Sequence, residues 1–526
     1  MTRQAEIYDT TLRDGTQGMG VSPTPGEKLR VARLLDELGV HFIEGGWPGA
    51  NPKDDEFFER AKTELRLERA TLVAFGSTRR PRGRVSDDAQ LQALLRADTD
   101  FVCIVGKSWD RHVLKALDTS LEDGLAMVGE SIEFLRERGK RVFFDAEHFF
   151  DGYRGNREYA LAVVETAARA GAERIVLCDT NGGTLPHQVA DTVRTVAERV
   201  DTALGVHFHN DSGCAVANTV LAFQAGATQL QVCVNGYGER TGNADLCSVV
   251  PNLTLKLGVD TIPAEGVGML HSTAHRVAEI MGKPVEPNRP YVGSAAFAHK
   301  AGLHTSGLAR LEGAYEHIDP KLVGNSATML VSELMGRSTV LSMASRNGWE
   351  LDPATAQALV ERVKTLEAEG YQFEAAEGSL ELLVRGETGG YEDPFETLGV
   401  EVRSGTGPDG EVVAVAELRL RIGGGEVTVT AKAPNGPVDA LDRALREALR
   451  PTHPEVDGLR LVDFKVRDLD SSDGTAARVR VLVETSDGYT SWGTVGVHRN
   501  IIQASWLALS DGIKVGLVRA RERSAV

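Results

Sequence analysis

Three segments of the chain repeat one pattern: RVFFDAEH (Arg141–His148), RIVLCDTN (Arg174–Asn181) and GVHFHND (Gly205–Asp211). In each segment a short apolar run, typical of a buried strand, ends in a group of polar side chains. Helical patterns follow the first and third segments, at Tyr159–Ala170 and Ala215–Ala225. Strands that alternate with helices pair in parallel through right-handed crossovers, so this part of the chain is expected to form an α/β fold.

The alternation continues on both sides of these segments. The other strand-like runs are Glu6–Tyr8, Val40–Glu44, Thr71–Phe75, Phe101–Val105 and Leu230–Val234. Eight strand–helix units in roughly 260 residues predict a closed (β/α)8 TIM barrel. In such barrels the active site lies at the carboxyl ends of the strands.

Polar residues of the types that take part in chemistry are concentrated at those predicted strand ends, and the predicted helix interiors supply almost none of them. They occupy Asp9–Gly15, Glu44–Gly46, Asp145–His148, Asp179–Asn181, His207–Asp211 and Asn235–Gly236. This distribution is typical of a catalytic barrel.

Length and charge limit the other possibilities. The 526 residues exceed what one hydrophobic core usually supports, so more than one domain is expected. The net charge of −17 argues against broad binding to nucleic acid or to an anionic membrane. We find no spanning apolar run and no signal-peptide pattern at the N-terminus, so we expect a cytoplasmic protein. The five cysteines include no CxxC pair and are predicted to be reduced thiols.

The remaining sequence suggests two further parts. We predict a catalytic barrel over 1–262, a helical connector subdomain over 263–397 and a C-terminal α+β domain over 398–526. The last part contains two similar strand–strand–strand–helix units, which indicates an internal duplication. Its first hairpin is predicted at Gly423–Gly425.

A cluster of metal-ligating residue types falls at the predicted strand ends. His207 and His209 are two positions apart on one strand, so both side chains point to the same face. Two imidazoles and the carboxylate of Asp14 would bind a divalent cation, and Asn243 could add an oxygen or hold a water. Arg13 could stabilise an enolate or carboxylate oxygen beside that cation. The alternatives are an accidental HxH pair, an ion-paired surface arginine and an asparagine that serves only as a turn residue.

Several motifs in this order resemble the 2-isopropylmalate, homocitrate and citramalate synthase family. They are DTTLRDGTQ (Asp9–Gln17), HFHND (His207–Asp211), GYGERTGNA (Gly236–Ala244), YEHIDPKLVG (Tyr315–Gly324) and, in the tail, GVHRNIIQASWLALSDG (Gly496–Gly512). Three others are most similar to the citramalate branch: EGGWPGANPKD (Glu44–Asp54), FGSTR (Phe75–Arg79) and DAEHFFDGY (Asp145–Tyr153). The tail resembles the family's regulatory domain.

The resemblance implies roles for particular residues. Asp14, His207 and His209 would be metal ligands with Asn243 near the metal, while the metal itself could be Mn, Mg or Zn. Arg13 would stabilise the developing oxyanion, and Thr180 would bind the carboxylate of the oxo acid. The remaining implied catalytic residues are Glu147, His304 and Tyr315, of which the last two belong to a connector that serves a partner subunit. A homodimer is therefore implied.

The implied reaction joins acetyl-CoA, pyruvate and water to give citramalate and CoA. A thioester methyl group is a weak carbon acid and needs a base, for which Glu147 and the His304–Tyr315 pair remain alternatives. Strand-end residues Phe75, Ile104 and Asp145 are predicted to limit the size of the oxo acid. We expect isoleucine, the end product of the pathway that citramalate feeds, to bind the tail as an allosteric effector.

Other functions are compatible with the sequence. The barrel could accept a larger 2-oxo acid, as in 2-isopropylmalate or homocitrate synthase. It could also be a lyase or aldolase that cleaves a carbon–carbon bond at the same metal site. An inactive barrel that serves as an amino-acid sensor is the alternative from another class.

Overall fold

A computed structural model describes residues 4–299, 311, 313–326, 328–329, 340–341, 344, 351–387, 391–406, 410–469 and 477–524. The chain divides into two compact units. The first comprises residues 1–297 and 316–327, and the second comprises residues 298–315 and 328–526.

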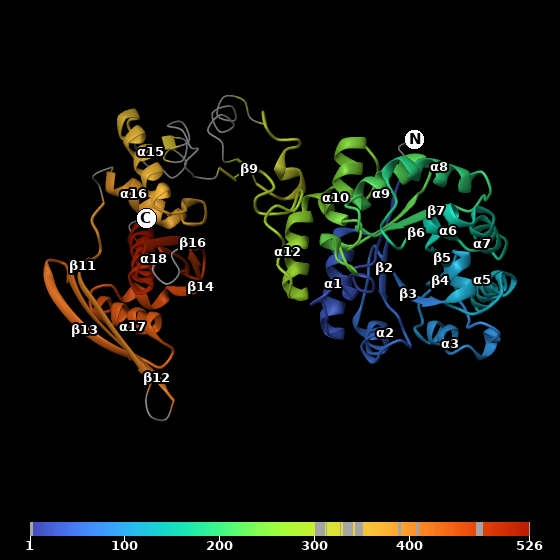
Figure 1. The fold of residues 1–526 in the computed structure, drawn as a ribbon, viewed down its shortest axis with the longest axis horizontal. Coiled ribbons are helices and arrows are strands. Elements are labelled where there is room, and N and C mark those ends of the chain that lie inside the picture. Colours follow the sequence, from blue (N-terminus) through green and yellow to red (C-terminus); the bar gives the residue numbers. More distant parts are fainter. Residues whose placement is uncertain are drawn as a thin grey trace. The chain divides into compact units, whose positions relative to one another are not determined.

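The first unit contains a closed barrel of eight parallel strands that follow one another in chain order (Figure 1). Strand β1 pairs with both β2 and β8, which closes the barrel. The strands are β1 (Glu6–Asp9), β2 (Phe42–Gly46), β3 (Thr71–Ser77), β4 (Phe101–Lys107), β5 (Arg141–Glu147), β6 (Arg174–Asp179), β7 (Leu204–Phe208) and β8 (Gln229–Val232). The predicted (β/α)8 barrel is confirmed, although several strands extend further than predicted.

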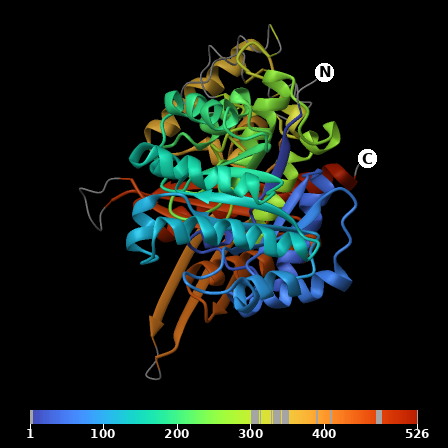
Figure 2. The same cartoon turned by 90° about the vertical axis from the view of Figure 1, so that its right-hand side faces the viewer.

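Helices pack against the outer side of the strands and cover the face of the barrel unit that is turned to the viewer in Figure 2. They are α1 (Pro25–Leu38), α2 (Pro52–Glu64), α3 (Ala89–Arg96), α4 (Asp110–Lys115), α5 (Leu121–Glu137), α6 (Phe149–Gly155), α7 (Arg157–Arg169), α8 (Pro186–Ala197), α9 (Ala215–Ala225) and α10 (Leu246–Pro251). The ends of α1 illustrate how the sequence sets their limits. Thr24 and Glu27 form a capping box at its start, and Gly39 ends it with a φ of 90°, a conformation that favours glycine.

Side chains of the strands alternate between two apolar regions. Tyr8, Phe75, Cys103 and Phe143 pack inside the barrel. Ile104, the residue after Cys103, packs outside it, in the core between the strands and the helices. This alternation decides which residues can reach the mouth of the barrel.

Residues predicted to form the connector are divided between the two units. Helices α11 (Ala264–Gly268) and α12 (Leu270–Met281) extend the core of the barrel unit, where α12 packs against α1. Helices α15 (Pro353–Ala368) and α16 (Glu377–Glu387) belong to the second unit. The division into three parts remains a prediction.

The second unit contains two three-stranded antiparallel sheets, each followed by a helix. The first consists of β11 (Glu396–Thr406), β12 (Val412–Ile422), β13 (Gly425–Ala433) and α17 (Pro437–Leu449). The second consists of β14 (Arg460–Asp468), β15 (Val479–Ser486), β16 (Ser491–His498) and α18 (Ile501–Ser524). The duplicated α+β tail and its glycine hairpin are confirmed, since Ile422 pairs with Gly425 across the turn.

Helix α18 follows the last strand of the second unit. Residues Ile501–Arg523 form a helix that is long and apolar enough to cross a membrane, judged by length and composition alone. Most of this helix is buried inside the structure, where it packs against β15 and β16. Its composition is therefore that of a core helix.

Candidate metal and substrate site

Asp14, His207 and His209 meet at the carboxyl end of the barrel. Their ligating atoms lie within 4.8 Å of one another, and all three residues are buried. Asp14 Oδ2 lies 3.5 Å from His207 Nε2 and 3.9 Å from His209 Nε2, and the two Nε2 atoms are 3.3 Å apart. The structure therefore brings together three of the four predicted metal ligands at one point.

Asn243, the fourth, lies behind Asp14. Its side-chain amide donates hydrogen bonds to Asp14 Oδ1 at 3.1 Å and to the carbonyl of Tyr237 at 3.2 Å. Its Oδ1 is buried and has no hydrogen-bond partner among the described residues. The contact with Asp14 means that Asn243 can orient the carboxylate.

Gln231, which no motif in the sequence indicates, fixes the orientation of His207. Its Oε1 lies 2.9 Å from His207 Nδ1, and its Nε2 donates to Asp145 Oδ1 at 2.9 Å. Because the amide nitrogen is used by Asp145, the amide oxygen must accept from His207 Nδ1–H. This tautomer leaves the Nε2 lone pair directed toward Asp14.

Arg13 is held on three sides. Its Nε donates to Glu44 Oε1 at 2.5 Å, one terminal nitrogen donates to Asp14 Oδ2 at 2.8 Å, and its guanidinium lies 3.8 Å from the centre of the Phe75 ring. Tyr8 donates a further hydrogen bond to Glu44 at 2.6 Å. The other terminal nitrogen, Nη2, makes no hydrogen bond within the described residues, so it can donate to a bound oxyanion.

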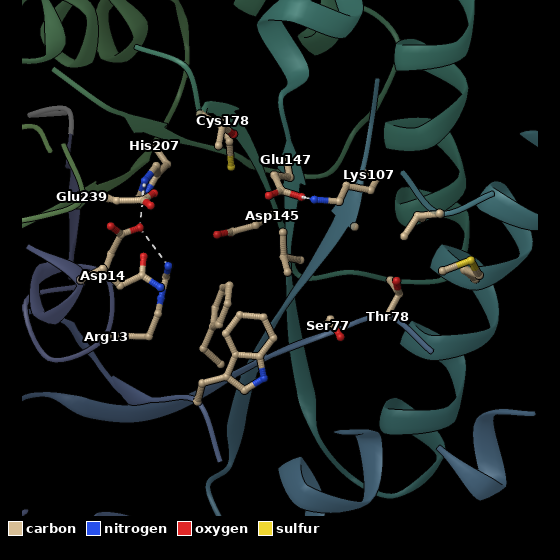
Figure 3. Close-up of a pocket in the computed structure, with 18 of the residues that line it drawn as sticks. Arg13, Asp14, Ser77, Thr78, Lys107, Asp145, Glu147, Cys178, His207 and Glu239 are labelled. Atoms are coloured by element: carbon tan, nitrogen blue, oxygen red, sulfur yellow. Dashed lines mark hydrogen bonds and ion pairs between the residues drawn. The ribbon is translucent and has the colours of Figure 1, made fainter. Parts of the chain in front are cut away.

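One cavity of about 450 Å³ contains most of the predicted site. In Figure 3, Asp14 and His207 lie at one side of it and Ser77 and Thr78 at the other. The predicted residues that line it are Arg13, Asp14, Glu147, Thr180, His207 and His209, together with the wall residues Phe75 and Asp145. The prediction that Ile104 forms part of the wall is wrong, because Ile104 points toward the helices and its neighbour Val105 lines the cavity.

Glu147 and Thr180 each have a defined partner in this cavity. Glu147 forms an ion pair with Lys107, which the sequence analysis did not single out. Thr180 Oγ1 accepts a hydrogen bond of 2.8 Å from the backbone N–H of His148. Because that oxygen is acting as an acceptor, its own hydrogen is available to a ligand in the cavity.

The two predicted connector residues have no demonstrated place in the site. His304 lies outside the described residues. Tyr315 lies in an exposed turn that belongs to the second unit. Their catalytic roles remain predictions.

The charges at the site are set by burial and by neighbouring groups. Burial alone would raise the pKa of Asp14, but Arg13, His207 and His209 hold it well below its usual range. Burial, and then the neighbouring His207, lower the pKa of His209 to about 3. Near neutral pH the cluster therefore presents a carboxylate and a neutral imidazole from His209.

This set of donors fits a divalent cation. One carboxylate oxygen and two imidazole nitrogens face a common point, as in metal sites that leave positions open for substrate. His209 Nδ1 is buried without a partner among the described residues, so no protein contact opposes the use of Nε2 as a ligand.

Family models match three consecutive parts of the chain. The model described as HMGL-like matches residues 4–265, and the model described as homocitrate synthase post-HMGL domain-like matches residues 291–371. The model described as LeuA allosteric (dimerisation) domain matches residues 374–517. The barrel and its cluster thus define the chain as a member of the divalent-metal-dependent HMGL-like class.

Curated relatives match over nearly the whole chain. The (R)-citramalate synthase of Aquifex aeolicus is 50% identical, with 99% of each chain covered. That of Streptomyces coelicolor is 48% identical, with 98% of this chain and 97% of the relative covered. A probable 2-isopropylmalate synthase of Methanopyrus kandleri is 33% identical, with 98% of both chains covered. The chain belongs to the 2-isopropylmalate, homocitrate and citramalate synthase family.

Proposed function

We propose that this chain is a transferase that condenses acetyl-CoA with pyruvate and water to give (R)-citramalate and CoA. The observation that carries the proposal is the identity of 50% with an (R)-citramalate synthase over 99% of both chains. The Asp14–His207–His209 cluster lies in a cavity of the size that a small 2-oxo acid and an acyl group require.

Asp14, His207 and His209 would hold the divalent cation, with Asn243 and Gln231 orienting two of these ligands. When bound, such a cation polarises the ketone of the oxo acid and binds its carboxylate. The protein's part is to keep Asp14 ionised and His207 in the tautomer with Nδ1–H, which the contacts of Arg13 and Gln231 do.

Arg13 and Thr180 would bind the charged groups of the substrate. The Nη2 group of Arg13 can donate to the oxygen on which negative charge develops, because Glu44 and Asp14 fix the rest of the guanidinium. The Thr180 hydroxyl can donate to the oxo-acid carboxylate, because its oxygen already accepts from His148. Neither the Arg13 guanidinium nor the Thr180 side chain has to move to make these contacts.

Removal of a proton from the acetyl methyl group requires a base. Glu147 lines the cavity and can serve if its ion pair with Lys107 opens toward the substrate. His304 with Tyr315 remains the alternative. A Glu147→Gln variant separates the two, because the amide keeps the shape of the side chain and removes its basicity.

The direct test measures release of CoA with acetyl-CoA and a series of 2-oxo acids: pyruvate, glyoxylate, 2-oxobutyrate, 2-oxoisovalerate and 2-oxoglutarate. We expect the highest kcat/KM with pyruvate. A higher value with 2-oxoisovalerate would instead assign the 2-isopropylmalate reaction. No condensation with any acceptor in the presence of Mn²⁺, Mg²⁺ or Zn²⁺ would support the inactive sensor.

The tail would regulate this activity. We propose a cytoplasmic homodimer that binds isoleucine through residues 398–526, and the match to an allosteric dimerisation domain supports this role. Titration with isoleucine, leucine, valine and threonine should show inhibition by isoleucine. Sedimentation should give the mass of a dimer. The mass of a monomer would contradict the proposed homodimer. If none of the four amino acids gives a heat of binding, the proposed effector site is contradicted.

A further inference from the structure

The cavity extends well beyond the metal cluster. Thr78 lies on the side away from His207 in Figure 3, and the lining also includes Arg79, Arg80, Leu117 and Met127. Figure 3 shows Ser77 and Thr78 at that side, with the Glu147–Lys107 pair between them and the cluster. None of the roles assigned above uses this far end, so the cavity has room for a second part of a substrate.

An arginine-rich loop follows β3 at this end. It carries Arg79, Arg80, Arg82 and Arg84 in a chain whose net charge is −17. Arg79 is buried and neutralised by Asp123 and Glu130, at 3.0 and 2.6 Å. Arg80, Arg82 and Arg84 are exposed, and none of them forms an ion pair with a described residue. No carboxylate of a described residue therefore neutralises these three guanidinium groups by direct contact.

The loop backbone is fixed. Asp88 accepts a hydrogen bond from the Arg80 backbone N–H at 2.9 Å and also caps α3. Asp123 accepts from the Arg82 backbone N–H at 3.2 Å in addition to its pair with Arg79. Both carboxylates are thus occupied by the loop itself, which leaves the outward guanidinium groups for another anion.

Two of the exposed arginines lie at or beside the cavity, which the buried Arg79 also lines. Arg80 lines it directly. Arg82 donates a hydrogen bond of 2.7 Å to the backbone carbonyl of Asp118, next to Leu117, which also lines the cavity. A ligand that reaches from the metal cluster past Thr78 would meet both guanidinium groups where it leaves the cavity.

We propose that Arg80 and Arg82 bind the phosphate groups of the acyl-CoA substrate, while the Thr78–Leu117–Met127 end of the cavity holds the neutral arm that carries the acyl group. This inference rests on the proposed function for the identity of the thioester. A strongly acidic protein repels a polyanionic cofactor, so unbalanced guanidinium groups at the cavity rim supply the attraction that binding needs. Arg84 lies further along the loop and is assigned no contact.

The test compares two acyl donors in Arg80→Gln, Arg82→Gln and the double variant. Acetyl-CoA carries the phosphates, and S-acetyl-pantetheine carries the same reacting group without them. We expect the KM for acetyl-CoA to rise about ten-fold for each single variant, as for the loss of a charge-assisted hydrogen bond. The KM for S-acetyl-pantetheine should change no more than it does in the control. The control is Arg96→Gln, an exposed arginine at the end of α3 that forms no ion pair with a described residue.

Calorimetric binding of CoA to the full chain gives a readout that does not depend on turnover. Weaker CoA binding in the double variant, with wild-type binding in Arg96→Gln, supports the assignment. Unchanged CoA affinity, or an equal rise in KM for both donors, would overturn it. Absence of condensation in the wild type would contradict the proposed function, whereas the calorimetric comparison still decides the phosphate site.

Discussion

The two units of the chain place their charged groups differently. In the barrel unit, Asp14, Glu44, Asp145, His207 and His209 are all buried, and they lie around one cavity or in contact with its lining residues. In the second unit, the open face of the first sheet carries charges at the surface, such as the Arg421–Glu396 and Arg403–Glu401 pairs. Its interior is formed largely by apolar residues from β12, α17 and α18, and two carboxylates that it buries, Glu381 and Asp511, are bonded to Arg519 and Ser379.

This difference separates function from stability. Buried charges weaken a fold unless each is paired, so their concentration in one place indicates a site. A largely apolar interior with charges at the surface stabilises the fold. It gives no indication of which ligand the unit binds. The following variants test that contrast, beginning with the largest expected effect.

Replacement of a metal ligand should abolish turnover and leave the fold intact. For His207→Ala we expect kcat/KM to fall at least about 1000-fold, because the cation and its polarising effect are lost. Metal content after dialysis should fall in parallel. His271→Ala, on α12 outside the cluster, should retain metal and activity. Full activity of His207→Ala in metal-free buffer would contradict the assignment.

A core substitution in the second unit should destabilise the fold of that unit and leave metal binding by the barrel intact. Trp506 is 2% exposed and packs in the apolar interior. We expect Trp506→Ala to lower the free energy of unfolding of this unit by about 3–5 kcal/mol. Trp506→Phe is the milder control. Calorimetric unfolding measures the loss, and metal binding by the barrel should remain at the wild-type level. Loss of metal from this variant would show that the two properties are not separable.

Loss of the group that orients His207 should weaken metal binding without abolishing it. We expect Gln231→Ala to reduce metal affinity about 10–100-fold, as for other groups that contact a ligand rather than the metal. The matched control is Gln229→Ala on the same strand, whose side-chain amide is buried without a partner among the described residues. Competition with a fluorescent chelator measures both affinities. Equal affinities for the two variants would show that the Gln231–His207 contact has no such role.

The smallest effect concerns pH and the second unit. Burial raises the pKa of Asp511 to about 6, and Ser379 donates a hydrogen bond of 2.8 Å to its carboxylate. Because the folded pKa exceeds the ordinary value near 3.8, its stabilising contribution is full below about pH 4 and is lost as the pH rises through about 6. Asp511→Asn should therefore stabilise the unit by about 1 kcal/mol at pH 7.5 and leave it unchanged at pH 4. Thermal unfolding at the two pH values provides the measurement, and an equal shift at both would contradict this account.

Much of the site could be predicted from the sequence. The HxH pair on one strand and the aspartate at the end of another were enough to predict that Asp14, His207 and His209 would meet, because parallel strands of a barrel end at one face. The glycine hairpin and the duplicated tail followed from turn residues and alternation.

The remainder depended on contacts between strands that no local pattern specifies. The sequence predicts Ile104 at the cavity wall, where the structure has Val105, because in a strand with a period of two a shift of one residue moves the side chain to the opposite face. Gln231 bonds to both His207 and Asp145, and Asp145 is distant from Gln231 in the sequence. Its one signal in the sequence is the pair of glutamines, Gln229 and Gln231, within a strand of the barrel.

The alternation inside β4 has a consequence for how such enzymes diverge. Cys103 and Val105 face the interior and the cavity, whereas Val102 and Ile104 face the helices. Neighbouring residues of β4 are thus under different selection, because one faces the ligand cavity and the next packs against the helices. Mutations at inward positions can explore new substrates while the outward positions keep the barrel folded. A family with several oxo-acid preferences on one architecture is what such a division of labour permits.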